Sequence, residues 1–245
     1  MKPDIFNQKG ITLIELMVAM AIAGVVAAAM FAFQQSQTRS YVTQEQLTVM
    51  QQNARAAMHF MTSELRMAGF DSGGAAGAGI EDASGNMIHF TMDFLSEPET
   101  SGDYTTVPVE KVSLDDTVYT FGVPDDAIDQ PGEEIVYRLN DGNIIRDDVL
   151  GAGESIIARN FDALNFVYYD GNGNRIPEAN LSNRLDDIRT VLVTILVRSG
   201  EGSPGFVFRH SDNQTYNNRE GDTLYSADDN FRRILLSTEV RLRNM

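Results

Sequence analysis

Few side chains in this sequence could carry out acid–base, nucleophilic or metal-assisted chemistry. The three histidines are His59, His89 and His210, and the sequence contains neither an HExxH zinc motif nor a GxSxG nucleophile elbow. The absence of cysteine excludes disulfides, thiolate zinc sites and cysteine nucleophiles. The adjacent carboxylates 115–116 and 228–229 fit solvated loops better than a catalytic pair, because a strand sends neighbouring side chains to opposite faces. We therefore expect a non-enzymatic protein.

One stretch, DGNGN at residues 170–174, has oxygen-bearing side chains at the alternate spacing of a calcium loop. In an EF-hand a bidentate acid would lie eleven residues after Asp170, but that position holds Leu181. The stretch is therefore not an EF-hand. A plain turn is the first interpretation, and an irregular calcium site that combines Asp170 and Asn172 with Asp186 or Asp187 is the second.

The composition predicts a folded and acidic protein. With 245 residues, 42% of them hydrophobic, the chain can bury a core in one or two domains. There are 35 acidic and 19 basic residues, which gives a formal net charge of -16. Nucleic acid is an improbable partner, because phosphate binding needs a basic face.

The apolar stretch from Ile11 to Phe33 carries a single carboxylate, Glu15. As a helix its 23 residues would measure about 35 Å, enough to cross a hydrocarbon core of about 30 Å. Lys2 and Lys9 precede it, so this end is expected to stay in the cytoplasm while the rest is exported. An unpaired carboxylate in a membrane costs about 2 to 3 kcal/mol even on lenient scales. Neither an ordinary secretory signal nor an ordinary anchor explains that cost.

The string KGITLIEL, residues 9–16, resembles the class III signal of type IV prepilins and pseudopilins. In that family a short basic leader, here residues 1–10, is removed on the cytoplasmic side after the glycine, here Gly10. The new N-terminal residue, here Ile11, is then methylated, although the family usually has phenylalanine at this position. The resemblance also implies that Glu15 pairs with the freed amine of a neighbouring subunit. Such a pair is physically sensible, because two charges that are costly alone in lipid neutralise each other.

The same resemblance implies partners and a location. The partners are prepilin peptidase, other minor and major pilins, and the inner-membrane platform that assembles the pilus. The chain would cross the inner membrane once, with its C-terminal domain in the periplasm, and would then join a pilus at the cell surface. No cofactor is implied. Many major pilins have a proline within this helix, and because residues 11–68 contain none, we expect no melted segment here.

Helical character continues beyond the apolar stretch. Small and apolar residues recur at spacings of three and four: Leu47, Met50, Ala54, Ala57, Met61, Leu65 and Ala68. This stripe predicts one helix from Ile11 to about Ala68 that ends at Gly69. The glycine-rich residues 72–79 would follow as a flexible connection. The expected organisation is a leader at 1–10, a membrane or filament-core helix at 11–33, an amphipathic helix at 34–70 and an exported β-rich domain at 71–245.

From residue 86 onward, short runs rich in Val, Ile, Tyr and Phe alternate with turn formers. The expected strands are 87–94, 117–123, 134–139, 143–149, 161–170, 187–199 and 231–244. Asn140-Asp141-Gly142 predicts a tight hairpin, because Asp-Gly readily supplies positive φ angles. Hairpins without intervening helices imply an antiparallel sheet. The fold class is therefore α+β, type IV pilin-like, with a long N-terminal helix on an antiparallel sheet and with surface loops at 95–106 and 200–229.

The last third of the chain narrows the resemblance. FVYYDGNGNRI at 166–176 and the terminal RRILLSTEVRLRN are similar to the corresponding parts of PilW-type minor pilins. This favours a minor pilin that helps to initiate or cap a type IV pilus. The alternatives are a J-type minor pseudopilin of type II secretion and, in a different class, a membrane-anchored binding or adhesive domain that does not assemble.

Two features of the C-terminal region remain open at this level. Many pilins close this region with a disulfide, and without cysteine we expect strand pairing alone to hold it. Four arginines allow two interpretations, a docking surface for an acidic neighbour or the solvent face of a final strand: Arg232, Arg233, Arg241 and Arg243.

Overall fold

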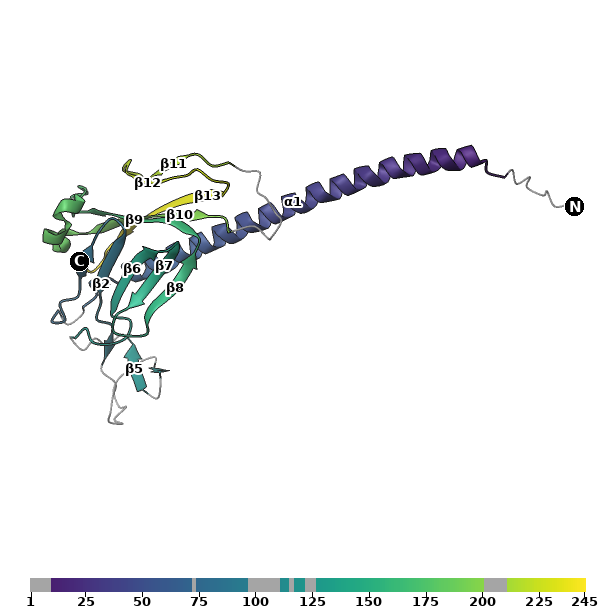
Figure 1. The fold of residues 1–245 in the computed structure, drawn as a ribbon. Coiled ribbons are helices and arrows are strands. Elements are labelled where there is room, and N and C mark those ends of the chain that lie inside the picture. Colours follow the sequence, from purple (N-terminus) through teal and green to yellow (C-terminus); the bar gives the residue numbers. More distant parts are fainter. Residues whose placement is uncertain (1–9, 72–73, 97–110, 115–116, 122–126, 201–210) are drawn as a thin grey trace, which may run out of the picture. The chain divides into compact units, whose positions relative to one another are not determined.

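The computed structural model describes residues 10–71, 74–96, 111–114, 117–121, 127–200 and 211–245 (Figure 1). Its contacts divide the chain into two units, Met1–Leu47 and Thr48–Met245. The helix α1, Leu13–Leu65, is continuous across the boundary between these units. Each unit is described by itself.

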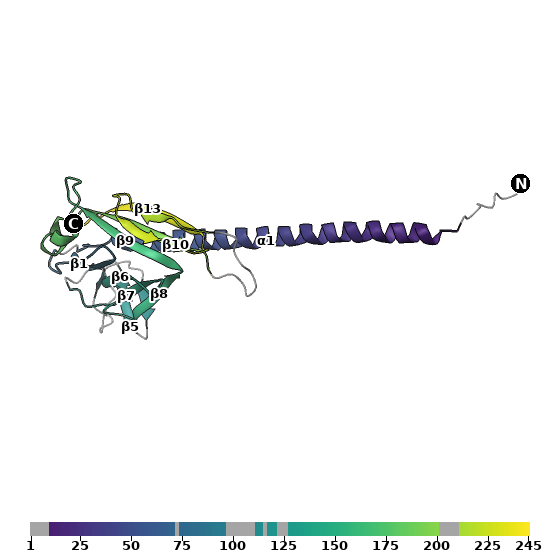
Figure 2. The same cartoon turned by 45° about the horizontal axis from the view of Figure 1, so that its top comes forward.

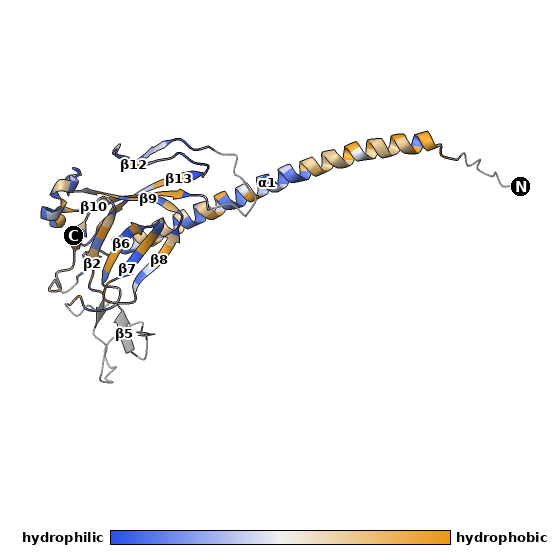
Figure 3. Cartoon of the chain, viewed as in Figure 1, coloured by the Kyte–Doolittle hydropathy of each residue, from blue (hydrophilic) through white to orange (hydrophobic). Residues whose placement is uncertain are grey.

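The first unit is the N-terminal part of α1. Its apolar side chains dominate up to Phe33, and polar residues become frequent after that point (Figure 3). Almost none of these side chains is buried by the rest of the chain. α1 is long and apolar enough to cross a membrane.

In the second unit, α1 contributes one face to the hydrophobic core. The predicted stripe is buried from Met50 to Ala68, whereas Leu47 is half-buried. The helix ends at Leu65, three residues earlier than predicted, because the chain tightens there and the amide of Ala68 donates to the carbonyl of Leu65. Gly69 then takes a positive φ of 72°, which lets the backbone turn away and its amide donate to Thr91.

A five-stranded antiparallel sheet has the order β1-β2-β6-β7-β8. Its strands are β1 Ile80–Ala83, β2 Met87–Thr91, β6 Glu134–Asn140, β7 Asn143–Asp148 and β8 Gly153–Arg159. The predicted hairpin is confirmed, since Asn140 pairs with Asn143 and the two residues between them have φ angles of 47° and 70°. β1 and β8 escaped prediction because both are edge strands with several exposed polar side chains.

A three-stranded antiparallel sheet has the order β13-β10-β9, and all three strands are labelled in Figure 2. Its strands are β9 Phe161–Tyr169, β10 Thr190–Arg198 and β13 Arg233–Arg241. β10 is the central strand and its seven inner residues are all buried, which explains why all of them except Thr194 are apolar. Tyr168 reaches from β9 to the first sheet, where its hydroxyl lies 3.0 Å from the carbonyl of Ser84.

The expected loop at 200–229 is wrong in part, because it contains a hairpin of β11 Thr215–Asn217 and β12 Thr223–Ser226. These strands are short and polar, so they lack the apolar alternation by which strands are predicted. A small sheet has the order β3-β5-β4, with β3 Leu95–Ser96, β4 Lys111–Leu114 and β5 Thr117–Phe121. β3 lies within the expected loop 95–106, whose residues 97–106 are outside the described residues.

A partly buried polar network ties the end of α1 to the five-stranded sheet. Glu64 accepts a hydrogen bond from the hydroxyl of Tyr137 on β6, and both of its oxygens lie 3.1 Å from Nε of Arg146 on β7. Arg146 Nη1 also lies 3.5 Å from Asp148. Burial and the neighbouring Glu64 raise the pKa of Tyr137 well above its ordinary value, so the phenol keeps its proton. The α+β prediction of an N-terminal helix packed on antiparallel sheets is confirmed.

Candidate functional site

The predicted processing residues, Gly10 and Ile11, lie just before α1 and are exposed. Apart from its chain neighbours, no atom lies within 4 Å of the position that a Cβ on Gly10 would take. The side chain of Ile11 is 80% exposed. The peptide bond between them is therefore not covered by any other part of the chain that the structure describes.

Glu15 has a local role at the start of α1. Its Oε2 accepts hydrogen bonds from the amide of Thr12 at 3.3 Å and from the hydroxyl of Thr12 at 3.2 Å, and the Thr12 hydroxyl accepts from the amide of Glu15 at 3.3 Å. This is a capping box, in which the residue before the helix and the third helical residue satisfy each other's free amides. The sequence signal Thr-x-x-Glu before an apolar run would have predicted it. The capping box thus gives the Glu15 carboxylate two hydrogen bonds at the start of its own helix. These bonds account in part for a charged residue within the apolar stretch.

The apolar surface of the first unit is uncovered. Large hydrophobic side chains from Ile11 to Phe33 are exposed, among them Leu13 at 78% and Ile14 at 72%. An apolar surface of this extent marks contact with lipid or with other protein chains. The N-terminal segment thus combines an accessible Gly-Ile bond, a capped acidic helix start and a surface that needs an apolar environment.

The DGNGN stretch forms a plain turn around Asp170. One oxygen of Asp170 accepts the amides of Asn172 and Asn174, each at 2.9 Å, and the other oxygen lies 3.4 Å from Arg184. The amide of Asn174 gives the largest contribution to a pKa of Asp170 below its ordinary value.

The remaining calcium candidates do not complete a cation site. Asp187 lies 2.7 Å from Nε of Arg184, so a guanidinium stands between it and Asp170. Asp186 is exposed and contributes its backbone carbonyl to Arg189. In the part of the chain that the structure describes, no three acidic or histidine side chains gather as metal ligands. As placed, these residues do not fit a calcium ion.

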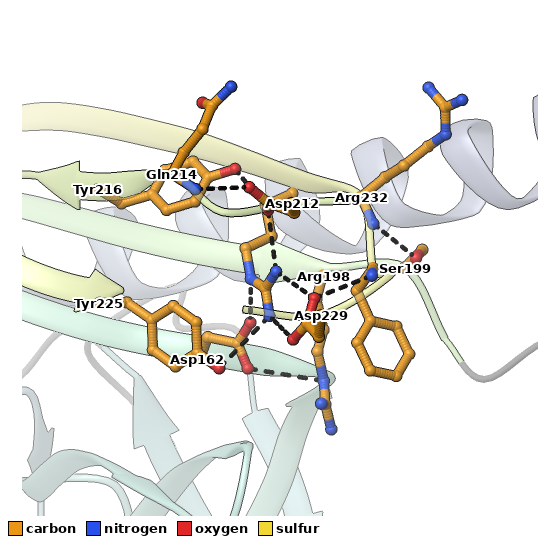
Figure 4. Close-up of polar contacts among 11 residues, drawn as sticks. Asp162, Arg198, Ser199, Asp212, Gln214, Tyr216, Tyr225, Asp229 and Arg232 are labelled. Carbon is orange, nitrogen blue, oxygen red and sulfur yellow. Dashed lines mark hydrogen bonds and ion pairs between the residues drawn. The ribbon is translucent and has the colours of Figure 1, made fainter. Parts of the chain in front are cut away.

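Sequence reasoning missed an ionic cluster centred on Arg233, whose partners Asp162, Asp212 and Asp229 are labelled in Figure 4. The side chain of Arg233 is 0% exposed. Its Nε lies 2.6 Å from Asp162 on β9, and its two terminal nitrogens lie 2.9 Å from Asp212 and 2.6 Å from Asp229. The guanidinium also lies 4.7 Å above the ring of Tyr225 on β12. One buried cation thus joins both ends of the β11–β12 hairpin to β9.

The electrostatics of this cluster keep it charged. Hydrogen bonds from Arg233 hold the pKa of Asp229 below its usual value. Burial alone would raise the pKa of Asp212, but hydrogen bonds from Arg233 and Tyr216 outweigh it and leave that pKa lowered. Hydrogen bonding to Asp229 raises the pKa of Arg233. Arg233 therefore remains a cation, and Asp212 and Asp229 remain anions well below neutral pH.

The cluster corrects three expectations. Strand pairing alone does not hold the C-terminal region, because the ion pairs of Arg233 also fasten the β11–β12 hairpin to β9 and β13. Arg233 belongs neither to a docking surface nor to a solvent face, whereas Arg241 and Arg243 are exposed. Asp229 is not a solvated acid, although its neighbour Asp228 is exposed.

The two histidines that the structure describes, His59 and His89, belong to no group of metal ligands. His59 is exposed on α1, and His89 on β2 lies 2.9 Å from Glu134 on β6. His210 and the acid pair 115–116 lie outside the described residues.

Comparison with known proteins adds the following. Residues 5–31 match the family model of the prokaryotic N-terminal methylation motif. No curated protein sequence matches the chain. A solved type IV-like pilin from Thermus thermophilus is similar in structure, with a TM-score of 0.43 and 11% identity, over 79% of this chain and 96% of that one. These values are low, so the fold described above rests on its own elements. The predicted prepilin-type N-terminus is confirmed as an N-terminal methylation motif.

Proposed function

We propose that the chain is a type IV pilin, and more narrowly a PilW-type minor pilin that helps to initiate or cap pilus assembly. The observation that carries the proposal is the methylation motif at residues 5–31, placed directly on an exposed Gly10–Ile11 bond and an uncovered apolar helix. The similarity of the last third of the sequence to PilW-type chains supports the narrower assignment.

The proposed mechanism begins with insertion of residues 11–33 into the inner membrane. Prepilin peptidase cuts after Gly10 and methylates the new amine of Ile11. The exported part then meets other minor and major pilins on the inner-membrane assembly platform. The apolar face of α1 exchanges lipid for neighbouring helices, so its burial persists when the subunit leaves the membrane.

Glu15 has two separable roles in this mechanism. Its hydrogen bonds with Thr12 cap the helix, and its charge attracts the freed amine of a neighbouring subunit. Glutamine at the third helical position still supports a capping box but carries no charge. Glu15→Gln thus retains the cap and loses the attraction, whereas Glu15→Ala loses both.

The deciding experiment measures the intact mass of the protein after expression with and without a prepilin peptidase. Loss of residues 1–10, with or without a methyl group on Ile11, is the expected result. A chain that starts near residue 30 would indicate an ordinary secretory signal. A chain that still starts at Met1 in the presence of the peptidase would favour a simple membrane anchor and would contradict the proposal.

A second experiment separates a pilus subunit from a J-type pseudopilin. Deletion of the gene is expected to reduce surface pili while leaving type II secretion intact. Loss of secretion with normal pili would assign the chain to the secretion system instead. A processed chain whose Glu15→Ala variant supports normal pili and secretion would favour an anchored domain that does not assemble.

A further inference from the structure

β13 is an edge strand that pairs regularly along its whole length. β13 pairs with β10 residue by residue over nine positions, Arg233–Arg241, with no register shift. None of the described residues pairs with its other edge. The strand contains no proline, and its middle, from Ile234 to Thr238, contains no charged residue. Natural proteins usually protect an edge with bulges, prolines or charges, because unpaired backbone groups there attract another strand.

The other sheet edges among the described strands show that protection. β1 has four residues and a register shift in its pairing with β2. β8 is bulged in its pairing with β7, and β9 is bulged in its pairing with β10. β3, β4, β11 and β12 have at most five residues each. β13 thus differs from every other described edge in being both long and regular.

A groove of about 260 Å³ lies between β13 and α1 within the second unit. On the strand side it is lined by Leu236, Ser237 and Thr238, which are half-buried. On the helix side the buried Met58 and Thr62 form its floor. The groove can therefore hold the side chains of another segment, and it lies directly beside the unpaired backbone groups of β13.

The rim of the groove carries the positively charged guanidinium of Arg55 and the imidazole of His59. Arg55 and His59 lie one helical turn apart on α1, are exposed, and have no ion-pair partner in the described part of the chain. No carboxylate lines the groove. This contrasts with the formal net charge of -16 for the whole chain. The local charge therefore selects an acidic occupant, while the protein's overall charge repels acidic chains elsewhere.

We propose that this groove binds an extended acidic segment of a partner protein, which adds a strand to the free edge of β13. Backbone hydrogen bonds to β13 supply affinity, alternate apolar side chains of the segment enter the groove beside Leu236, and a carboxylate of the segment meets Arg55 and His59. A helical segment could not use the unpaired backbone groups of the strand. The proposal concerns only the second unit and does not depend on prepilin processing.

The test uses the full chain in detergent micelles and three seven-residue peptides. The first alternates valine and threonine and has glutamate at both ends, the second has lysine at both ends, and the third is the first with proline at its centre. Affinity is measured by fluorescence anisotropy, and the location of binding by hydrogen exchange. We expect the glutamate peptide to protect amides of β13, the lysine peptide to bind at least tenfold more weakly, and the proline peptide to give no protection.

Variants check the charge. Arg55→Glu should remove the preference for the glutamate peptide, whereas the matched control Arg39→Glu, which lies in the first unit, should leave it unchanged. The proposal is overturned by equal affinity for the two charged peptides, by protection elsewhere in the chain, or by no binding. Protection of β13 that grows with protein concentration in the absence of peptide would also overturn it, because the occupant would then be a second copy of this chain.

Discussion

Replacing Arg233 by methionine should destabilise the second unit by about 3 kcal/mol. The substitution keeps much of the side-chain volume but leaves Asp162, Asp212 and Asp229 without their shared cation. Removing one partner from a buried ion pair costs roughly 3 to 5 kcal/mol. We take the lower end because the side chain of Asp229 is 27% exposed and Arg198 remains 3.6 Å from Asp162. For a domain of this size the melting temperature should fall by about 6 to 12 °C.

The same substitution should change the pH dependence. In the native protein the lowered pKa values of Asp212 and Asp229 mean that these acids stabilise the fold at neutral pH, and that this contribution is lost as the pH falls below about 4. Without Arg233 the neighbouring carboxylates repel one another, so protonation of one of them stabilises the folded variant. The stability difference between the two proteins should therefore shrink between about pH 6 and pH 4.

The assay is thermal unfolding of the full chain in micelles, followed by circular dichroism at several pH values, with hydrogen exchange over residues 211–229. The matched control is Arg243→Met, because Arg243 is exposed and such changes usually stay within about 0.5 kcal/mol. Adding Asp212→Asn and Asp229→Asn to the Arg233 variant should restore part of the stability. A loss below about 1 kcal/mol with unchanged hairpin exchange would refute the assigned role of the cluster.

Three further predictions follow from local geometry. Glu15→Gln should keep the helix cap yet reduce surface pili as strongly as Glu15→Ala, and normal pilus counts for Glu15→Gln would show that capping rather than charge is required. Gly69→Ala should lower the free energy of unfolding by more than about 1 kcal/mol, because φ is 72° and the new Cβ would lie 2.6 Å from the side chain of Met245. Thermal unfolding measures this loss, and Gly171→Ala is the control, because its Cβ would meet only an ordinary contact at 3.7 Å. Tyr137→Phe should lower the free energy of unfolding by about 1 kcal/mol, measured in the same way, because Glu64 loses one hydrogen bond but keeps its contact with Arg146. A loss above about 3 kcal/mol would mean that the Tyr137 hydroxyl, and not Arg146, contributes most of the network's stability.

Elements with strong local patterns were predictable from the sequence. The stripe from Met50 to Ala68 repeats at three and four residues, and the Asp-Gly turn of the β6–β7 hairpin needs positive φ angles that few residues accept. Weakly patterned strands were not predictable. β8 is an exposed edge, and the polar β11–β12 hairpin depends on partners elsewhere for its stability.

The main features of the N-terminal segment, its methylation motif and its long helix, were also predictable from the sequence. Its signals, Gly10, Glu15 and the apolar stretch that follows, lie within a few residues of one another and act through the helix that they themselves form. The capping box belongs to the same class, because Thr12 and Glu15 are three residues apart. Such local interactions need no tertiary context to be recognised.

The Arg233 cluster was decided by the tertiary structure alone. Arg233 meets Asp162 across 71 residues of sequence and Asp212 across 21, and nothing in their local patterns pairs them. In the sequence, Arg233 looks like the exposed Arg241 and Arg243, because all three alternate with apolar residues along the last strand. Its side chain is buried only because the segments flanking the β11–β12 hairpin lie over it. Local pattern fixes which residues can form a strand or a helix, whereas the burial and pairing of a charge depend on which distant segments the chain brings over it.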